Sequence, residues 1–110
     1  MVFNTGAALL DAIVLAVVSR NLEGTYGYKI TQDMKGAIEV SESTLYPVLR
    51  RLQKDGALTV YDEPFNGRNR RYYRLTDIGR ERLARYVSEW ETFQEGVDKL
   101  LLGGIGDDQE

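Results

Sequence analysis

The sequence predicts a mainly helical domain with a small β part, an α+β fold in which helices are followed by one hairpin and a last helix. Three observations predict it. Apolar residues recur at helical spacing in several segments, two short stretches alternate as strands do, and the pair Asn66-Gly67 lies between those stretches. At 110 residues the chain is long enough for one small domain with a modest core.

Composition excludes several classes of active site. The chain has no cysteine and no histidine, so it cannot form disulfides, thiolate or imidazole metal sites, or the usual hydrolytic triads. It also lacks the glycine-rich loop followed by lysine and serine or threonine that binds nucleotide phosphates. We therefore expect a protein that is not an enzyme and that carries no metal or cofactor.

Charge is distributed unevenly along the chain. The net charge is −3, which argues against an indiscriminate binder of polyanions. Between Ser41 and Arg85, however, ten lysines and arginines stand against six acidic residues, whereas the rest of the chain has four against eleven. A basic middle between acidic ends indicates one surface that faces nucleic acid on an otherwise acidic protein.

The first expected element is an apolar helix over residues 6–18. Asp11 interrupts its apolar stretch, which is too short to span a bilayer. The five residues before it carry none of the positive charge that a signal peptide requires. We expect a helix buried on most of its surface and no membrane partner, and the lack of a targeting segment is consistent with a cytoplasmic protein.

The second helix is expected within residues 25–36. Thr25 is a suitable N-cap, and Ile30 and Met34 continue a buried stripe. Tyr28 and Lys29 face outward near the helix start. Free amides and the positive end of the helix dipole favour a phosphate at that position.

The third helix has two faces and is the most informative part of the chain. A stripe at i, i+3, i+4 and i+7 predicts its buried side, formed by Leu45, Val48, Leu49 and Leu52. The opposite side carries small, hydroxyl-bearing and basic residues, namely Ser43, Pro47, Arg50 and Lys54, with Tyr46 and Arg51 flanking them. Such a helix can lie in the major groove of DNA, although an ordinary surface helix with a solvated charged face has the same pattern.

Two features of this helix leave alternatives open. Ser41 and Ser43 are both suitable caps, and Pro47 lies past the tolerated first turn if Ser41 is the cap. A start nearer Ser43 or a local kink would accommodate the proline. Arg51 either contacts DNA or pairs with a carboxylate such as Asp55.

A hairpin follows Gly56, which ends the helix. Residues 57–61 and 70–75 alternate as strands, and residues 62–69 indicate a turn-rich connection between them. Two strands directly after an amphipathic helix form a wing. Residues 1–76 therefore predict a winged helix-turn-helix domain that binds DNA.

Arginines gather at the tip of this wing. Arg68, Arg70 and Arg71 lie there, and Arg74 lies further along the returning strand. Arginine is suited to phosphate and minor-groove contact. The plainer interpretation is that these cations balance neighbouring carboxylates of the hairpin.

The last helix is expected over residues 77–102, with Thr76 as its N-cap. Apolar residues recur at intervals of 3, 4, 3, 4 and 3 and form the seam Leu83, Tyr86, Trp90, Phe93, Val97 and Leu100. One long helix cannot bury such a seam in a small winged domain, so the seam predicts a two-fold homodimer. The alternative is that it folds back, partly against the first helix. Residues 103–110 are expected to be a flexible acidic tail.

The ordered motifs of residues 7–83 resemble the PadR family of bacterial transcriptional regulators. They are Tyr26-Gly-Tyr-Lys-Ile30, Ser43-Thr-Leu-Tyr-Pro47, Arg51-Leu52 with Gly56, Gly67-Arg68, Tyr72-Tyr-Arg-Leu-Thr76 and Gly79. The resemblance implies a dimeric winged-helix repressor that binds an inverted-repeat operator and releases it when a small molecule binds. The single helix after the wing is similar to a short subfamily, which includes a lactococcal multidrug sensor and dimerises through that helix.

The resemblance and the residue pattern together give the expected site residues. The expected DNA contacts are Tyr28, Lys29, Ser41, Ser43, Thr44, Tyr46, Pro47, Arg50, Arg51, Lys54, Arg68 and Arg70. In the short subfamily a tryptophan at the dimer interface stacks flat aromatic drugs. Trp90 resembles that tryptophan, and Phe93 lies near it in the seam. Plain packing in the interface is the simpler role for both residues. A winged-helix module for protein interaction and a ligand-sequestering dimer that does not bind DNA are the alternative functions.

Overall fold

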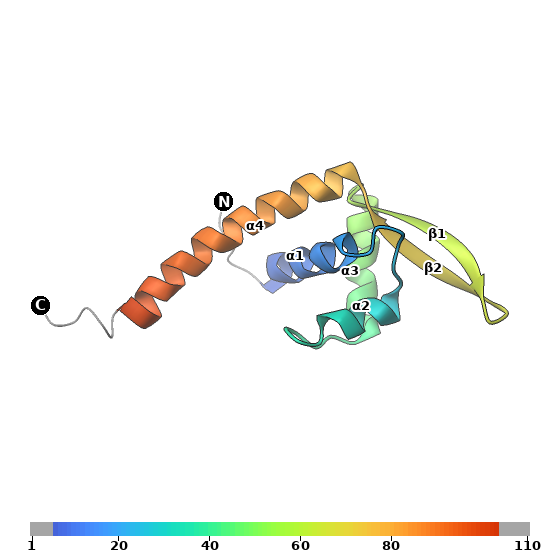
Figure 1. Ribbon diagram of the computed structural model, residues 1–110, viewed down its shortest axis with the longest axis horizontal. Coiled ribbons are helices and arrows are strands. Elements are labelled where there is room, and N and C mark those ends of the chain that lie inside the picture. Colours follow the sequence, from blue (N-terminus) through green and yellow to red (C-terminus); the bar gives the residue numbers. More distant parts are fainter. Residues whose placement is uncertain (1–5, 104–110) are drawn as a thin grey trace, which may run out of the picture.

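The computed structural model describes residues 6–103, a three-helix body with a wing on one side and a long helix projecting from the other (Figure 1). The elements, in chain order, are α1 (Gly6–Ser19), α2 (Gly27–Met34), α3 (Glu42–Lys54), β1 (Leu58–Phe65), β2 (Arg68–Leu75) and α4 (Asp77–Asp98), which continues as a π-helical turn, Lys99–Gly103. The predicted fold class, mainly helical with a two-stranded wing, is confirmed. Residues 104–110 of the expected tail lie outside the described residues.

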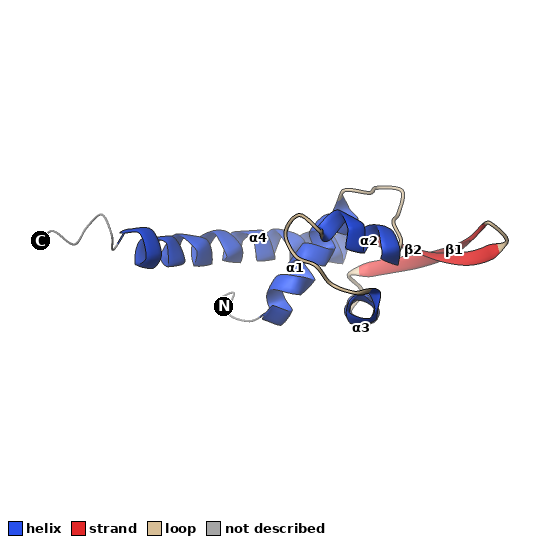
Figure 2. Cartoon of the chain, turned by 90° about the horizontal axis from the view of Figure 1, so that it is seen from below, coloured by secondary structure: helices blue, strands red, loops and turns tan. Residues whose placement is uncertain are grey.

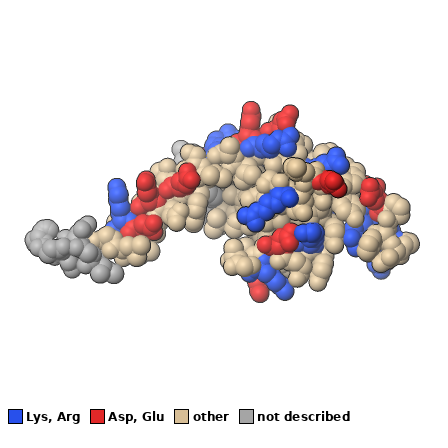
Figure 3. Space-filling view, viewed as in Figure 1, with Lys and Arg blue, Asp and Glu red and all other residues tan. Residues whose placement is uncertain are grey.

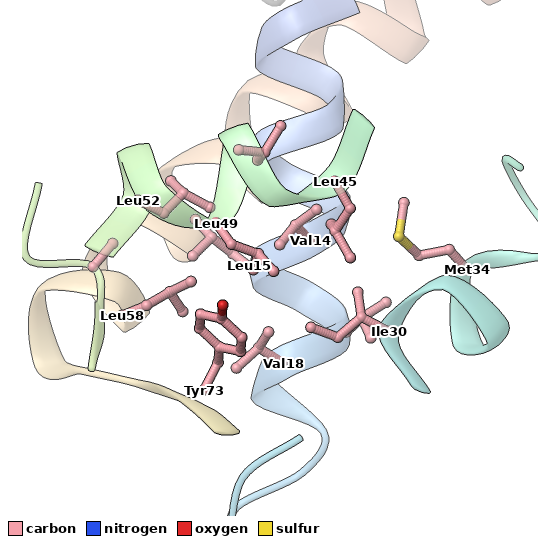
Figure 4. Close-up of a cluster of buried hydrophobic side chains, with 13 residues drawn as sticks. Val14, Leu15, Val18, Ile30, Met34, Leu45, Leu49, Leu52, Leu58 and Tyr73 are labelled. Atoms are coloured by element: carbon pink, nitrogen blue, oxygen red, sulfur yellow. The ribbon is translucent and has the colours of Figure 1, made fainter. Parts of the chain in front are cut away.

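The core lies where α3 crosses α1. The apolar stripe of α3 is buried as predicted, with Leu45, Leu49 and Leu52 fully buried. These leucines point toward Val14 and Leu15 of α1 (Figure 4). Because the chain itself covers this whole stripe, the opposite side of α3 is left facing outward.

Thr25 does not cap α2, contrary to the sequence-based expectation. It is fully buried and pairs with β2 instead, through backbone hydrogen bonds in both directions with Tyr73 (3.0 and 2.7 Å). Tyr26 is the N-cap residue of α2 and makes no side-chain cap hydrogen bond. The prediction was wrong because a long-range strand pairing outweighs local capping preference at this residue.

The cap of α3 is Ser41, which settles the open alternative. Its Oγ accepts a hydrogen bond from the amide of Thr44 at 3.2 Å. Pro47 therefore lies inside the helix, which runs on through it to Lys54. The proline cannot donate to the carbonyl of Ser43, four residues earlier, so that carbonyl lacks its usual helical donor.

The wing is longer than its sequence pattern predicts. Residues 62–65 and 68–69, expected in the connection, belong to the strands, and the turn is only Asn66-Gly67, both with positive φ. Pro64 is tolerated because it faces Asn69 in a pair that exchanges no hydrogen bonds, so its missing amide points away from β2.

Thr76 caps α4, as predicted. Its hydroxyl accepts from the amide of Gly79 at 3.0 Å and donates to the carbonyl of Gly56 at 2.6 Å. Gly79 packs so tightly that a Cβ there would lie 2.2 Å from the carbonyl oxygen of Ala57. The start of α4 is thus fixed against the end of α3, and this sets the direction in which α4 leaves the body.

Among the helices within residues 6–103, none is both long enough and apolar enough to cross a membrane.

Candidate nucleic-acid interface

An open cleft of about 730 Å³ lies between the wing and the starts of α2 and α3. Figure 2 shows α3 end-on at the edge of the body, with the wing projecting beside it. Three elements line the cleft, with Tyr26, Gly27 and Tyr28 from the start of α2, Glu42 and Tyr46 from α3, and Phe65, Asn66 and Arg68–Arg71 from the wing. The structure therefore brings together four residues that the sequence singled out on separate elements, namely Tyr28, Tyr46, Arg68 and Arg70. The other predicted contacts on α3 do not line this cleft.

The outward side of α3 is polar at its start and basic toward its end. Ser43, Thr44 and Pro47 are exposed, as are Arg50 and Lys54. Ser41 is exposed too, but its hydroxyl already bonds to the Thr44 amide and to the Ser43 hydroxyl, 2.9 Å away. Ser41 thus orders the helix start, while the residues that follow it are presented to solvent.

Tyr46 is held more firmly than an ordinary surface residue. Its hydroxyl donates to the carboxylate of Glu42 at 3.0 Å, and burial together with this bond raises the pKa of the Tyr46 phenol. A Cβ on Gly27 would lie 2.6 Å from that hydroxyl oxygen. The ring therefore fits against the start of α2 only because residue 27 is glycine, and it ties α3 to α2.

The start of α2 lies at the edge of the cleft, which Tyr26, Gly27 and Tyr28 line, and the side chain of Tyr28 is exposed. Tyr26 makes no side-chain cap hydrogen bond, and the N-terminus of α2 is the positive end of the helix dipole. Lys29 instead forms an ion pair with Asp33 at 2.8 Å, one turn further along. Its charge is partly compensated within α2.

The four wing arginines differ in their surroundings. The Arg70 guanidinium lies between two rings, 3.5 Å from the centroid of Phe65 and 3.9 Å from that of Tyr26. Arg71 pairs with Asp62 at 3.1 Å, and this contact holds the pKa of the Asp62 carboxyl below its usual range. The plainer interpretation, cations balancing carboxylates, thus holds for Arg71.

Arg68 and Arg74 complete the set. Arg68 is exposed at the turn beside the cleft, in an antiparallel pair with Phe65. Arg74 is exposed further along β2, where its guanidinium lies 5.0 Å from the ring of Tyr61. Arg68 is therefore the wing cation best placed for a ligand in the cleft.

Arg51 pairs with a carboxylate, as one sequence alternative proposed, but the partner is Asp11 rather than Asp55. Two hydrogen bonds of 2.8 and 2.9 Å join its guanidinium to the nearly buried carboxylate on α1. Asp55 pairs with Arg82 of α4 at 3.2 Å. These two ion pairs anchor α3 to α1 and α4, and we leave Arg51 out of the proposed DNA contacts.

The seam of α4 is divided between two environments. Leu83 and Tyr86 pack against the core of the same chain, which is the fold-back alternative. Trp90 and Phe93 are exposed at 38% and 40%, with ring centroids 6.1 Å apart, and Leu100 is exposed at 81%. An apolar groove of about 400 Å³ runs beside the inner part of the seam, lined by Leu9, Ala12, Ile13, Ala16, Ala37, Ile38, Leu83, Tyr86, Val87 and Trp90.

Several cleft residues were not singled out from the sequence. Tyr26 and Phe65 hold Arg70, and Glu42 holds Tyr46. Glu42 had a local signal, because an acidic residue in the first turn of a helix is favoured by the dipole. The ring partners of Arg70 had none, since they become neighbours only when the hairpin folds beside α2.

Comparisons with known proteins agree on one family. The family model described as Transcriptional regulator PadR-like family matches residues 14–85. Transcriptional regulator Rv3488 of Mycobacterium tuberculosis is 42% identical over 80 residues, which cover 72% of this chain and 71% of that protein. The crystal structure of smu.1704 from Streptococcus mutans is 38% identical, with a TM-score of 0.79 and coverage of 94% and 95%. Bacillus subtilis PadR in complex with operator DNA shares the fold, at 24% identity and a TM-score of 0.66 over 72% of this chain and 47% of that one.

Proposed function

The chain belongs to the PadR-like family of transcriptional regulators, and we propose that it is a dimeric, sequence-specific DNA-binding repressor released by a small planar aromatic molecule. The proposal divides the chain into a DNA-binding domain (1–76), a dimerisation helix (77–102) and an acidic tail (103–110). It also locates the protein in the cytoplasm, with its operator. Because the family consists of regulators, no enzymatic activity is proposed.

The convergence of three polar surfaces on one cleft supports DNA binding. The start of α3, through Glu42 and Tyr46, the uncapped start of α2 and the arginine-bearing wing border the same open space. The solved complex of Bacillus subtilis PadR with operator DNA has the same fold. We propose that Ser43, Thr44 and Pro47 meet base edges, and that Tyr28, Arg50, Lys54, Arg68 and Arg70 position the protein on phosphates.

Exposed apolar residues on α4 support the dimer and the effector site. Trp90, Phe93 and Leu100 expose apolar surface that a single chain of this size does not usually leave in water. A second copy would cover it. We propose that a planar aromatic effector stacks on Trp90 and Phe93 at this interface, where binding would alter the separation of the two DNA-binding domains.

A mobility-shift titration with an inverted-repeat fragment tests the DNA-binding proposal. We expect specific binding that weakens steeply as salt is raised. Arg68→Ala should weaken binding to all sequences alike and reduce the slope of log K against log salt by ~1. Arg71→Ala is the matched control, because Arg71 is engaged with Asp62 and should change the slope less. A change in sequence preference for Arg68→Ala would contradict its role as a phosphate contact, and the absence of any shift would favour a ligand-sequestering dimer.

Dye binding tests the effector proposal. Trp90→Ala should abolish binding of planar aromatic cations, measured by fluorescence titration, while Leu22→Ala, a change at an exposed residue of the body, should leave it unaltered. Unchanged dye affinity in Trp90→Ala dimers would exclude Trp90 from the site.

A further inference from the structure

Arg70 is the wing arginine whose guanidinium is held by aromatic rings rather than by a carboxylate. Charges of both signs lie on the wing (Figure 3), and Glu63 is opposite Arg70 in the strand pairing. Within residues 6–103, however, the Arg70 guanidinium forms no ion pair, whereas Arg71 pairs with Asp62. The charge of Arg70 therefore remains available for an anion from outside the chain.

Two rings enclose this guanidinium and leave its edge open. The guanidinium carbon lies over the ring of Phe65, on the neighbouring strand, and over the ring of Tyr26, just before α2. The N–H groups of a guanidinium point outward in its own plane, so rings packed against its faces leave them available to an acceptor. Both rings and Arg70 line the open cleft. The donors thus lie beside the space in which a phosphate would bind.

The ring of Tyr26 is itself held by a series of contacts that leads back to the body. It meets Tyr72 edge-on, with ring centroids 5.6 Å apart, and Tyr72 stacks on Tyr61 with centroids 5.2 Å apart. The hydroxyl of Tyr61 donates to the carbonyl of Glu23, in the loop between α1 and α2. Arg70 is therefore held relative to the body as well as relative to the wing.

Arg68 is the opposite case on the same side of the wing. It lies two residues before Arg70 in β2, so the two side chains point to the same face of the hairpin. In the part of the chain that the structure describes, its guanidinium lies over no ring and forms no ion pair. Such a side chain loses rotamer freedom when it binds a phosphate, whereas a side chain held by rings has already lost it on folding. The two arginines should therefore differ in the entropy that each loses on binding.

We propose that Tyr26 and Phe65 are positioning residues for DNA binding, which hold the Arg70 guanidinium in the orientation that it uses to bind a backbone phosphate. This inference rests on the proposed function and adds to it how the wing contact is prepared before DNA binds. The two rings act through Arg70, because they reduce the entropy lost at that side chain in the complex. They also connect the wing to the start of α2, so the phosphate contact has a fixed place beside that helix.

A double-mutant cycle measured by mobility shift tests whether Tyr26 acts through Arg70. Tyr26→Leu should raise the dissociation constant by about three- to tenfold for each half-site, because the Arg70 side chain must then be ordered on binding. In an Arg70→Gln background the same change should have almost no effect. In an Arg68→Gln background, the matched control, it should keep its full effect. Equal losses in all three backgrounds would overturn the proposal, because Tyr26 would then act through the fold or through a contact of its own.

Salt dependence and a conservative variant separate positioning from direct contact. Tyr26→Leu should leave the slope of log K against log salt unchanged, because it removes no phosphate contact, while Arg70→Gln should reduce that slope. Tyr26→Phe keeps the ring and should restore the affinity that Tyr26→Leu loses. A loss in Tyr26→Phe as large as that in Tyr26→Leu would show that the hydroxyl contacts DNA, and it would overturn the positioning role.

Phe65→Leu repeats the test from the wing without a change in the body. Phe65 is 44% exposed, so the variant should fold even if Tyr26→Leu does not, and circular dichroism checks this. We expect Phe65→Leu to weaken DNA binding in the unchanged chain and to have almost no effect in the Arg70→Gln background. The same loss in both backgrounds would exclude an action of Phe65 through Arg70.

NMR relaxation of the arginine side-chain Nε–H groups, recorded without DNA, separates this inference from the proposed function. We expect a higher order parameter for Arg70 than for Arg68, with the value for Arg68 below about 0.6. Tyr26→Leu and Phe65→Leu should each lower the value for Arg70. An Arg70 as mobile as Arg68, in a protein that still shifts the inverted-repeat fragment, would overturn the inference and leave the regulator intact. A rigid Arg70 in a protein that shifts no DNA would contradict the proposed function and, with it, the role of the two rings.

Discussion

Helices α3 and α4 both carry an apolar stripe, but the chain buries the whole stripe only in α3. The stripe of α3 is at most 7% exposed, whereas Trp90, Phe93 and Leu100 of α4 are exposed at 38% or more. In α3 the leucines are used within the chain, and hydroxyls and cations remain for an external partner. In the outer half of α4 the apolar side itself faces solvent and remains for an external partner. The difference indicates two kinds of partner, a polyanion for α3 and a second protein surface for α4.

The two helices are also mechanically connected. Arg51 joins α3 to α1 through Asp11, and Arg82 joins α4 to the end of α3 through Asp55. Thr76 and Gly79 fix the start of α4 on the same end of α3. A change in how α4 meets its partner would therefore be transmitted to the helix that we propose binds DNA.

The largest effect is expected from a cavity under α3. Leu49→Ala should lower the free energy of unfolding by about 2–5 kcal/mol, because Leu49 is fully buried between α3 and α1. Leu100→Ala is the matched change on the exposed stripe and should leave the unfolding of the monomer almost unchanged. Urea denaturation at a concentration below the dimer dissociation constant measures both. Similar losses of unfolding free energy for the two variants would contradict the claim that the chain buries the α3 stripe and leaves Leu100 exposed.

Two glycines of α4 provide the next contrast. Gly79→Ala should destabilise the fold by about 1–3 kcal/mol, because its Cβ would overlap the carbonyl of Ala57. Gly96→Ala, in the projecting half, meets nothing within 4 Å and should stabilise the helix by up to ~1 kcal/mol. Thermal denaturation followed by circular dichroism gives the sign of the stability change for each variant. A stabilising Gly79→Ala would show that α4 is not fixed against the end of α3.

A smaller effect is expected at the ion pair that anchors α3. Asp11→Asn should cost about 1–2 kcal/mol of unfolding free energy and weaken DNA binding, because a nearly buried carboxylate holds Arg51 with two hydrogen bonds. Asp33→Asn, which breaks the exposed pair with Lys29, should cost no more than ~0.5 kcal/mol. Urea denaturation and the mobility shift measure the two quantities. Equal costs for both variants would argue against an anchoring role for Asp11.

The smallest effect concerns pH and the wing. Because Arg71 lowers the pKa of Asp62 in the folded state, this pair favours the folded state above the ordinary aspartate pKa, and its contribution is lost as pH falls through the lowered value. Both side chains of the pair are exposed to solvent, so the effect on stability should be slight. Titration of the Asp62 carboxyl by NMR should show a pKa below the ordinary value, and Arg71→Gln should raise that pKa, while the hydrogen bond from the Asn69 side chain continues to lower it. An unchanged midpoint in Arg71→Gln would contradict the pairing.

Local patterns in the sequence were sufficient for most of the fold. The buried stripe of α3 and the cap at Thr76 are both confirmed, because each depends on residues close together in the chain. The errors concern residues decided by distant partners. Thr25 pairs with Tyr73 rather than capping α2, and Arg51 finds a carboxylate forty residues away. Only the fold brings such residues together.

The candidate site was predicted to a similar degree. The outward placement of Ser43, Pro47 and Arg50 follows from helical periodicity alone, and the structure presents these residues outward as expected. The environment of Arg70 could not be predicted, since its rings come from the residue before α2 and from the opposite strand. The length of the wing was underestimated because Pro64 indicates a turn unless its place in the strand pairing is known.

The proposed roles of the two helices, DNA binding by α3 and dimerisation through α4, are tested most directly by footprinting genomic fragments that the purified protein selects. We expect two protected half-sites, inverted relative to each other and about one helical turn (~10 bp) apart, with two chains bound per site. A single unrepeated half-site occupied by one chain, or no enriched sequence at all, would contradict a pair of DNA-binding surfaces held together by α4.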